Sequence, residues 1–137
     1  MDIDVFPPGE DEREFYCNMG KFFASRSVRK ELPYLSNSDA TTWVVISENE
    51  DIIAFSAFEV FKSKIELKHA YVLPEHRNKG IYEQMIDIRM ELLSSVTLPI
   101  TVAVANHDNA SRFKGRGFEV EKVTKNYTFM RRNVKTQ

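Results

Sequence analysis

The stretch from Ile65 to Leu93, IELKHAYVLPEHRNKGIYEQMIDIRMELL, holds the most specific pattern in the chain. It opens with a strand-like segment, passes through a basic turn with one glycine, and ends in a segment with helical periodicity. The spacing of four, three and four residues is carried by Ile81, Met85, Ile88 and Leu92, and Ile86, Met90 and Leu93 widen the apolar stripe. We predict a mostly buried helix of about fifteen residues here.

The turn before this helix has the composition of an anion site. Pro74 cannot donate to a sheet ladder and holds Leu73 in extended geometry, so the strand ends there. Gly80 lets the backbone come close to a bulky group where the helix begins, and the first helical amides have no internal partners. Arg77 and Lys79 add positive charge. The sequence predicts a phosphate-binding turn; the alternative is an ordinary solvated connection between strand and helix.

The strand before the turn changes the face on which its apolar residues lie. Ile65 and Leu67 share one parity, whereas Ala70 and Val72 share the other. A β-bulge between the two pairs would place all four on one face. The alternative is a regular strand with one buried face, formed by Ile65, Leu67, His69 and Tyr71.

Length and composition limit the class of protein. The chain has 137 residues, 42% of them hydrophobic, which is the size of one domain with one core, so we predict a single domain over residues 1–137. Cys17 is the only cysteine and excludes an intramolecular disulfide. No apolar run is long enough to span a bilayer and the amino terminus is acidic, so we expect no membrane partner and a cytoplasmic location. The three histidines lie in separate segments, and we assign no metal.

Charge is distributed unevenly along the chain. Residues 1–59 hold 12 acidic and 5 basic side chains, a net charge of −7, and residues 112–137 hold 8 basic and 2 acidic ones, a net charge of +6. Most such charge is solvated surface. The basic carboxy-terminal part lacks interleaved aromatic residues of a nucleic-acid-binding module, so we do not expect nucleic acid as a partner.

The remaining segments alternate between helical and strand patterns. The predicted elements, in order, are a strand at 3–6, helices at 10–24 and 25–32, strands at 42–47 and 52–61, the central strand and helix, a strand at 100–105, a short helix capped by Asp108 or Asn109, and a hairpin of 118–122 with 127–132. One helical crossover requires parallel neighbours, and the hairpins are antiparallel. The fold class is therefore α/β (α+β), with a mixed, mostly antiparallel sheet of six or seven strands and about four helices.

Two motifs resemble those of one enzyme family. The pattern Val72-x-Pro74-x-x-Arg77-x-x-Gly80, between a strand and an amphipathic helix, is similar to the acetyl-CoA signature of GNAT-superfamily N-acetyltransferases, although Tyr82 stands where the family has a small residue. Downstream, the family pattern of Asn, then Tyr, then Gly-Phe is matched in spacing by Asn106, Phe113, Gly117 and Phe118. The predicted order β-α-α-β-β-β-α-β-α-β-β is also that of the family. The resemblance covers nearly the whole chain.

The resemblance implies transfer of an acetyl group from acetyl-CoA to an amine. The acceptor would be a protein lysine, a protein amino terminus or a small amine, and the acidic amino-terminal part would draw amines in. The residues that the resemblance implies for cofactor binding are Tyr71, Val72, Arg77, Asn78, Lys79, Gly80, Ile81, Tyr82, Asn106 and Phe113. Glu66 falls on the strand position of the catalytic glutamate in the histone-acetyltransferase branch; the alternative is a solvent-facing glutamate paired with Lys64 or Lys68.

Departures from the family pattern leave a second hypothesis open. Phe113 stands where the family has a tyrosine that protonates the departing thiolate, and a phenyl ring cannot donate a proton. Tyr127 and Tyr82 are the candidates to replace it. The alternative function is a GNAT-fold binding or structural module with weakened or lost catalysis. An exposed edge in the closing hairpin can pair two copies into a homodimer.

Overall fold

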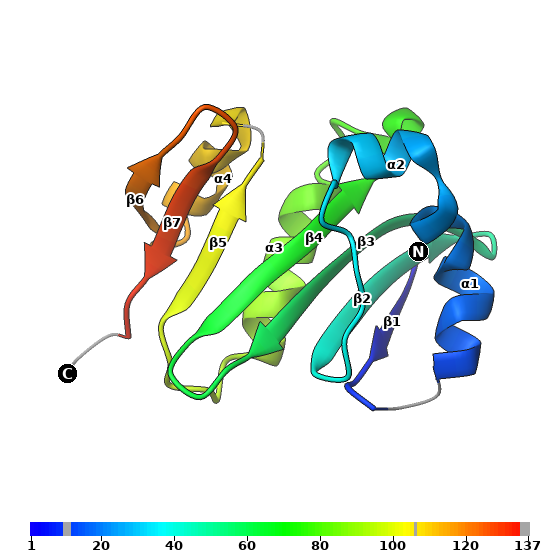
Figure 1. Cartoon of the computed structure of the whole chain (residues 1–137), viewed down its shortest axis with the longest axis horizontal. Helices are drawn as coiled ribbons and strands as arrows, with labels where there is room; N and C mark the ends of the chain where they lie inside the picture. The colour runs from blue at the N-terminus through cyan, green and yellow to red at the C-terminus, as the bar shows by residue number, and fades with distance from the viewer. Residues whose placement is uncertain (10–11, 106, 135–137) are drawn as a thin grey trace.

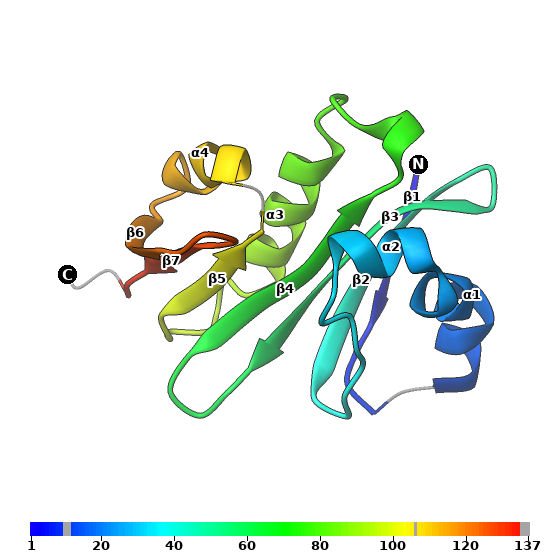
Figure 2. The ribbon, with the colours of Figure 1, turned by 45° about the horizontal axis from the view of Figure 1, so that its top comes forward.

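The computed structural model describes residues 1–9, 12–105 and 107–134 of the chain. Its strands are β1 (Asp2–Phe6), β2 (Thr41–Glu48), β3 (Asp51–Val60), β4 (Ile65–Val72), β5 (Ile100–Val104), β6 (Glu119–Val123) and β7 (Thr128–Arg132). Its helices are α1 (Glu12–Ala24), α2 (Arg26–Glu31), α3 (Ile81–Leu92) and α4 (Ala110–Lys114), with the 3-10 turns η1 (Pro74–His76) and η2 (His107–Asn109). One sheet runs through the molecule, with α1 and α2 on one face and α3 and α4 on the other (Figures 1 and 2).

The described strands form one sheet in the order β1-β2-β3-β4-β5-β7-β6. Among the strands of the described residues, only β4 and β5 pair in parallel, because α3 crosses from the end of one to the start of the other. All other neighbours are antiparallel. The mixed, mostly antiparallel sheet, the four α-helices and their order along the chain confirm the predicted fold class.

The predicted β-bulge in β4 is present. Phe55 of β3 pairs with Tyr71 and Ala57 pairs with Lys68, so the single residue between them faces two residues of β4. One of these two, His69, has a positive φ of 57°. The bulge shifts the pleat by one residue, so Leu67 and Val72, which are five residues apart, both pack in clusters with residues of α3 on one face of the sheet. A regular strand would place them on opposite faces.

The buried face of α3 differs in part from the predicted stripe. Ile81, Met85, Ile86 and Leu93 are buried as expected, but Leu92 is 43% exposed and Arg89 is 1% exposed. The helix ends at Leu92, after 12 residues instead of about fifteen. Successive residues of a helix are 100° apart, so residues four apart lie on nearly the same side. Steps of four residues from Ile81 and Met85 lead to position 89 and not to position 92. No helix in the described part of the chain combines the length and the apolar character needed to cross a membrane.

The predicted cap of α4 is wrong for Asn109. This residue occupies the N-cap position, but its side chain makes no capping hydrogen bond. Its backbone is already helical, with φ −74° and ψ −13°, because η2 runs directly into α4. An N-cap side chain bonds the helix amides from an extended backbone, which Asn109 does not have.

The core is divided by the sheet. On one face, aromatic residues of α1 pack on β2 and β3, with Phe15 5.2 Å from Trp43 and Phe22 5.2 Å from Phe55 between ring centroids. On the other face, α3 packs over β3 and β4, and α4 completes a cluster that includes Phe113 and Phe118. Both faces of the central strands are thus covered, which fixes the ends of β4 and β5 in place.

Candidate active site

A cleft of about 670 Å³ opens where β4 and β5 separate. Their pairing comprises three residue pairs and ends at Leu67 opposite Val102, although β4 continues to Val72 and β5 to Val104. The cleft is lined by the diverging segments 67–72 and 102–105, together with the start of α3 and part of α4. Each segment therefore presents a strand edge to the cleft that the other strand does not pair.

The turn before α3 closes one end of the cleft. Asn78 has a φ of 64° and Gly80 a φ of 81°, and alternation of left-handed residues with ordinary ones turns backbone N–H groups toward a common point. The first bond along the helix runs from Gln84 N to Gly80 O at 3.0 Å. The amides of the preceding first turn have no acceptor within the helix. The residues at this helix start, among them Gly80 and Ile81, line an end of the cleft that is suited to an anion.

Arg77 anchors this turn to the rest of the protein. Its Nε donates to Val72 O at 2.8 Å, its Nη2 donates to Glu31 Oε2 at 2.9 Å, and its guanidinium lies 5.3 Å from the ring centre of Tyr71. The hydrogen bond to Glu31 is the largest cause that raises the pKa of Arg77. The guanidinium of Arg77 thus joins the turn to β4 and α2, and Arg77 also lines the cleft.

The wall between α3 and α4 is aromatic and charged. The ring of Tyr82 meets the ring of Phe113 edge to face, with centroids 6.2 Å apart, and the guanidinium of Arg112 lies 5.2 Å from the centre of the Tyr82 ring. Arg112 also pairs with Glu83 at 3.0 Å. Burial raises the pKa of Tyr82, and the charges of Arg89 and Arg112 oppose this rise. The phenol therefore stays protonated at neutral pH.

His69, the residue with positive φ in the bulge, lies on the side of the cleft formed by β4. Burial, and next the charge of Lys68, lower its pKa to about 4. Its imidazole is neutral at physiological pH. A neutral imidazole has one nitrogen that can accept a hydrogen bond and one that can donate.

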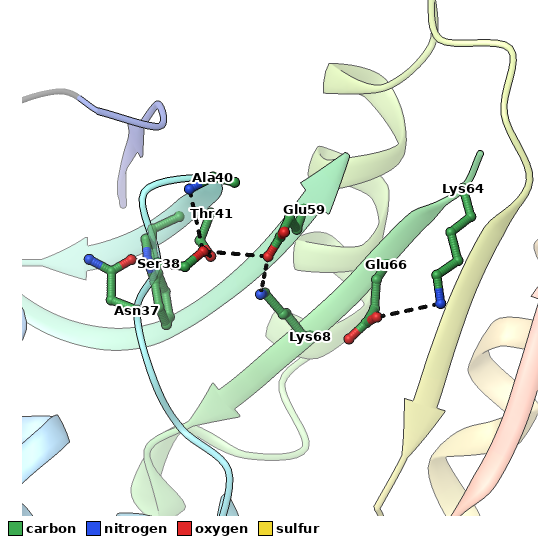
Figure 3. A network of polar contacts seen from close by, with 9 residues as sticks. Asn37, Ser38, Ala40, Thr41, Glu59, Lys64, Glu66 and Lys68 are labelled. Atoms are coloured by element: carbon green, nitrogen blue, oxygen red, sulfur yellow. Dashed lines mark hydrogen bonds and ion pairs between the residues drawn. The ribbon is translucent and has the colours of Figure 1, made fainter. Parts of the chain in front are cut away.

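The carboxylates of Glu59 in β3 and Glu66 in β4 belong to a polar group whose Lys68 also lines the cleft. Figure 3 shows Lys68 joined to Glu59, which also accepts from Ser38, and Glu66 joined to Lys64. The Lys68–Glu59 contact is 2.7 Å long and its side chains are 19% and 15% exposed. Glu66 pairs with Lys64 at 3.9 Å, with side chains 40% and 45% exposed. Glu66 is directed to the side of β4 that carries Lys64, and it does not line the cleft.

The structure brings most of the predicted site residues together. Eight of them line the cleft: Tyr71, Val72, Arg77, Asn78, Gly80, Ile81, Tyr82 and Phe113. Lys79 is exposed and Glu66 and Tyr127 lie elsewhere, the latter at the connection from β6 to β7 with its ring 5.9 Å from Phe129. Asn106 lies outside the described residues.

Several charged or ionisable residues of the cleft were not among the predicted site residues, and they include Lys68, His69, Arg89 and Arg112. The position of Arg89 indicated burial, because it lies on the same side of the helix as Ile81 and Met85. Its charge nevertheless led us to assign it to the polar side. His69 was considered as a core position of a regular strand and, with the other histidines, as a metal ligand, but not as a residue of the cleft. Arg112 had no distinguishing pattern.

Comparison with known proteins identifies the family. The family model for the acetyltransferase (GNAT) family matches residues 9–118, most of the chain and all of the cleft. The chain belongs to the acetyltransferase (GNAT) family. Membership makes this GNAT protein an acyltransferase, as expected from the two motifs.

Solved structures with the same fold differ widely in sequence from this GNAT protein. Escherichia coli ElaA is 14% identical, with a TM-score of 0.78 over 97% of this chain and 100% of its own. An acyl-CoA N-acyltransferase from Pseudomonas aeruginosa is 14% identical, with a TM-score of 0.75 over 96% and 98%. The PaiA N-acetyltransferase from Thermoplasma acidophilum, in complex with coenzyme A, is 15% identical, with a TM-score of 0.63 over 97% and 99%. At such identities the likeness extends to the fold.

Proposed function

We propose that this GNAT acyltransferase moves an acetyl group from acetyl-CoA to an amine. The observation that carries the proposal is the continuity of the cleft, which joins a helix N-terminus suited to phosphate with two unpaired strand edges. Acetyl-CoA has the matching parts in the matching order, namely a diphosphate, an arm with two amides, and a thioester at the end. A related structure of the same fold is a complex with coenzyme A.

The diphosphate would lie on the turn from Asn78 to Tyr82. Gly80 and Ile81 would offer backbone amides at the positive end of α3, where the helix dipole favours negative charge. Arg77 and Lys79 would add positive charge, Arg77 from a position fixed by its hydrogen bonds and Lys79 from an exposed side chain. Tyr82 occupies a position where the family motif has a small residue, and its ring packs edge to face on Phe113.

The arm would extend along β4 toward the bulge. Amides of the arm can pair with the open edge of β4 near Tyr71 and Val72, in the same way that a peptide adds to a sheet edge. Phe113 offers an apolar surface on the opposite wall. We also assign Asn106, on the resemblance of its motif, to contact with the arm.

Catalysis requires an amine that has lost its proton, because a lysine-like amine has a pKa of about 10.4. Glu66 is our candidate for the base that takes this proton, acting through water because it lies outside the cleft. Tyr82 is our candidate for the proton donor to the departing thiolate, since its phenol is protonated and lies in the cleft wall. Tyr127 is the second candidate and is less favoured, because it does not line the cleft.

The acceptor is an amine on a protein or on a small molecule. Lys68 and Glu59 form an ion pair beside Glu66, which pairs with Glu59 between β3 and β4. Carboxylates in this region favour a cationic acceptor. A protein lysine, a protein amino terminus and a small polyamine all satisfy this requirement.

A thiol-release assay with acetyl-CoA and a panel of amines tests the proposal. We expect free thiol to appear only when both acetyl-CoA and an accepted amine are present. We expect acetyl-CoA also to raise the stability of the protein, by about 2.7 kcal/mol at a concentration one hundred times its dissociation constant. Stabilisation without thiol release from any amine would favour the second function, a binding module of the same fold, for which the apolar Phe113 is the supporting observation.

Replacement of Glu66 by Gln tests its role within the proposal. We expect the rate to fall and to depend more steeply on pH, because the amine would then lose its proton only to solvent. Lys64→Met, which removes the charge paired with Glu66, is the matched control and should keep most of the activity. Unchanged kinetics in the Glu66 variant would remove this residue from the mechanism.

A further inference from the structure

Arg89 is a fully buried cation on the face of α3 that meets the sheet, where it is 1% exposed. Its Nε donates to Met85 O at 3.2 Å, within the helix. Its Nη1 donates to Ala57 O of β3 at 3.1 Å. Two of its three nitrogens are therefore used to hold the guanidinium in one position.

The third nitrogen has no partner in the described part of the chain. Nη2 is buried without a hydrogen-bond acceptor, and no carboxylate forms an ion pair with Arg89 among the described residues. Burial lowers the pKa of Arg89 to about 10, which still leaves it charged at neutral pH. A buried charge without a counter-charge is costly, and such groups gather at functional sites. Since Arg89 lines the cleft, a group bound there can satisfy it.

The depth of Arg89 in the cleft matches the reactive end of the cosubstrate. Arg89 lies nine residues beyond Gly80, which corresponds to about 13 Å along the helix. The arm of coenzyme A between diphosphate and sulfur has about the length of four extended residues, or about 14 Å. Arg89 also donates to the carbonyl oxygen of Ala57, and Ala57 pairs with Lys68 beside the bulge. Lys68 directly follows Leu67, where the pairing of β4 with β5 ends. The diphosphate and Arg89 would thus lie at the two ends of the bound arm.

We propose that Arg89 is a catalytic residue whose Nη2 donates a hydrogen bond to the carbonyl oxygen of the thioester. The inference rests on the proposed function, since it requires an acyl-CoA in the cleft. It adds to that function a fixed positive charge at the reacting carbonyl.

The charge of Arg89 acts at one stage of the transfer. The lone pair of the amine forms the new bond to the carbonyl carbon, and the carbonyl π pair moves to oxygen, where Nη2 stabilises it. The pair then returns to re-form the carbonyl as the carbon–sulfur bond breaks and its electrons leave with sulfur. The amine proton passes to the base, Glu66 or water, and the thiolate takes a proton from Tyr82, which regains one from solvent.

Replacement of Arg89 by Met separates this role from a structural one. Removing one oxyanion donor lowers kcat by about 10²- to 10³-fold in enzymes that depend on it, and we expect a loss of about 10²-fold with the KM for acetyl-CoA changed less than about threefold. The melting temperature of the free protein should stay the same or rise, because Met fills the space without an unpaired charge. Arg89→Lys keeps the charge and should recover part of kcat. Arg131→Met, outside the cleft, is the control and should keep wild-type kinetics.

Three outcomes would overturn the role of Arg89. The first is a kcat within about threefold of wild type in Arg89→Met. The second is a lower melting temperature in Arg89→Met that accounts for the whole loss of activity. The third is a wild-type preference for succinyl-CoA over acetyl-CoA that Arg89→Met abolishes, because Nη2 would then bind a carboxylate of the acyl chain. Wild-type protein that neither binds acetyl-CoA nor releases thiol would instead overturn the proposed function, and this inference with it.

Discussion

The imidazole of His69 stacks on the indole of Trp43, with ring centroids 5.5 Å apart and planes inclined by 10°. Trp43 is itself fixed, because its Nε1 donates to Asn37 Oδ1 at 2.8 Å and its side chain is 1% exposed. The positive φ of His69 in the bulge allows the ring to reach this position. The stack holds a neutral imidazole at the side of the cleft.

We expect the stability of the protein to depend on His69 between pH 6.5 and 4. The pKa of His69 is lowered in the folded state to about 4 from 6.5. In this window the unfolded chain binds a proton that the folded chain excludes, so stability falls as pH falls and the contribution levels off below pH 4. The loss is at most about 3 kcal/mol. Urea unfolding across this range measures it.

His69→Asn is the matched control for this prediction, because asparagine tolerates a left-handed backbone better than most residues. Carboxylates also titrate near pH 4, so the useful quantity is the difference in unfolding free energy between wild type and variant. This difference should shrink as pH decreases through the window. Parallel curves for the two proteins would show that His69 does not titrate as described.

Replacement by alanine should lower the stability of the protein at Gly80 and raise it at Gly20. Gly80 has a φ of 81° and a Cβ added there meets no heavy atom within 4 Å, so the cost of Gly80→Ala is in the backbone alone, about 1 kcal/mol. Gly20 lies within α1 and also has open space around a Cβ, so Gly20→Ala should stabilise by about 0.5–1 kcal/mol. Chemical denaturation measures both. Stabilisation by Gly80→Ala would contradict the left-handed geometry of the turn.

Tyr82 and Phe113 offer a reciprocal test of the proton donor. Tyr82→Phe should lower kcat by about 10²-fold, the lower end of what a general acid contributes, because the phenol that protonates the thiolate is lost. Adding Phe113→Tyr should restore part of the rate, since both rings line the cleft and contact each other. Steady-state kinetics with acetyl-CoA measures both effects. Equal rates for wild type and Tyr82→Phe would exclude Tyr82 as the donor.

Arg77 should matter more for stability than its ion-pair partner Glu31. Arg77→Lys loses the directed bond to Val72 O and the contact with the Tyr71 ring, at a cost of about 1–2 kcal/mol. Glu31→Gln loses only a half-exposed ion pair, which is worth about 0–1 kcal/mol. Thermal unfolding at low and high salt distinguishes the two. An equal, salt-sensitive loss in both variants would mean that the ion pair alone anchors the turn.

Local patterns in the sequence were sufficient for the fold. The change of parity after Leu67 predicted the bulge, because a strand can bury apolar residues on both parities of one face only by gaining a residue. The periodicity from Ile81 predicted α3, and Pro74 fixed the end of β4. These features depend on neighbours along the chain, which a sequence displays directly.

The site was predicted only in part, because it depends on contacts between distant segments. The turn at Asn78 and Gly80 was predicted, since its geometry is local. The burial of Arg89 follows from its bond to Ala57, 32 residues earlier in the chain, and the hydropathy pattern assigns a charged residue to the surface. The neutral His69 likewise depends on Trp43, which belongs to a different strand.

Binding of acetyl-CoA compared with acetyl-pantetheine, measured by isothermal titration calorimetry, tests most directly whether the turn before α3 holds a diphosphate. Acetyl-pantetheine carries the same thioester and arm but lacks both the diphosphate and the adenosine 3′-phosphate, so the Gly80→Val variant is needed to assign the difference to the turn. We predict that acetyl-CoA binds at least about tenfold more tightly, a difference of about 1.4 kcal/mol, and that Gly80→Val removes most of this difference. Equal affinities for the two compounds, or no binding of acetyl-CoA, would contradict the account.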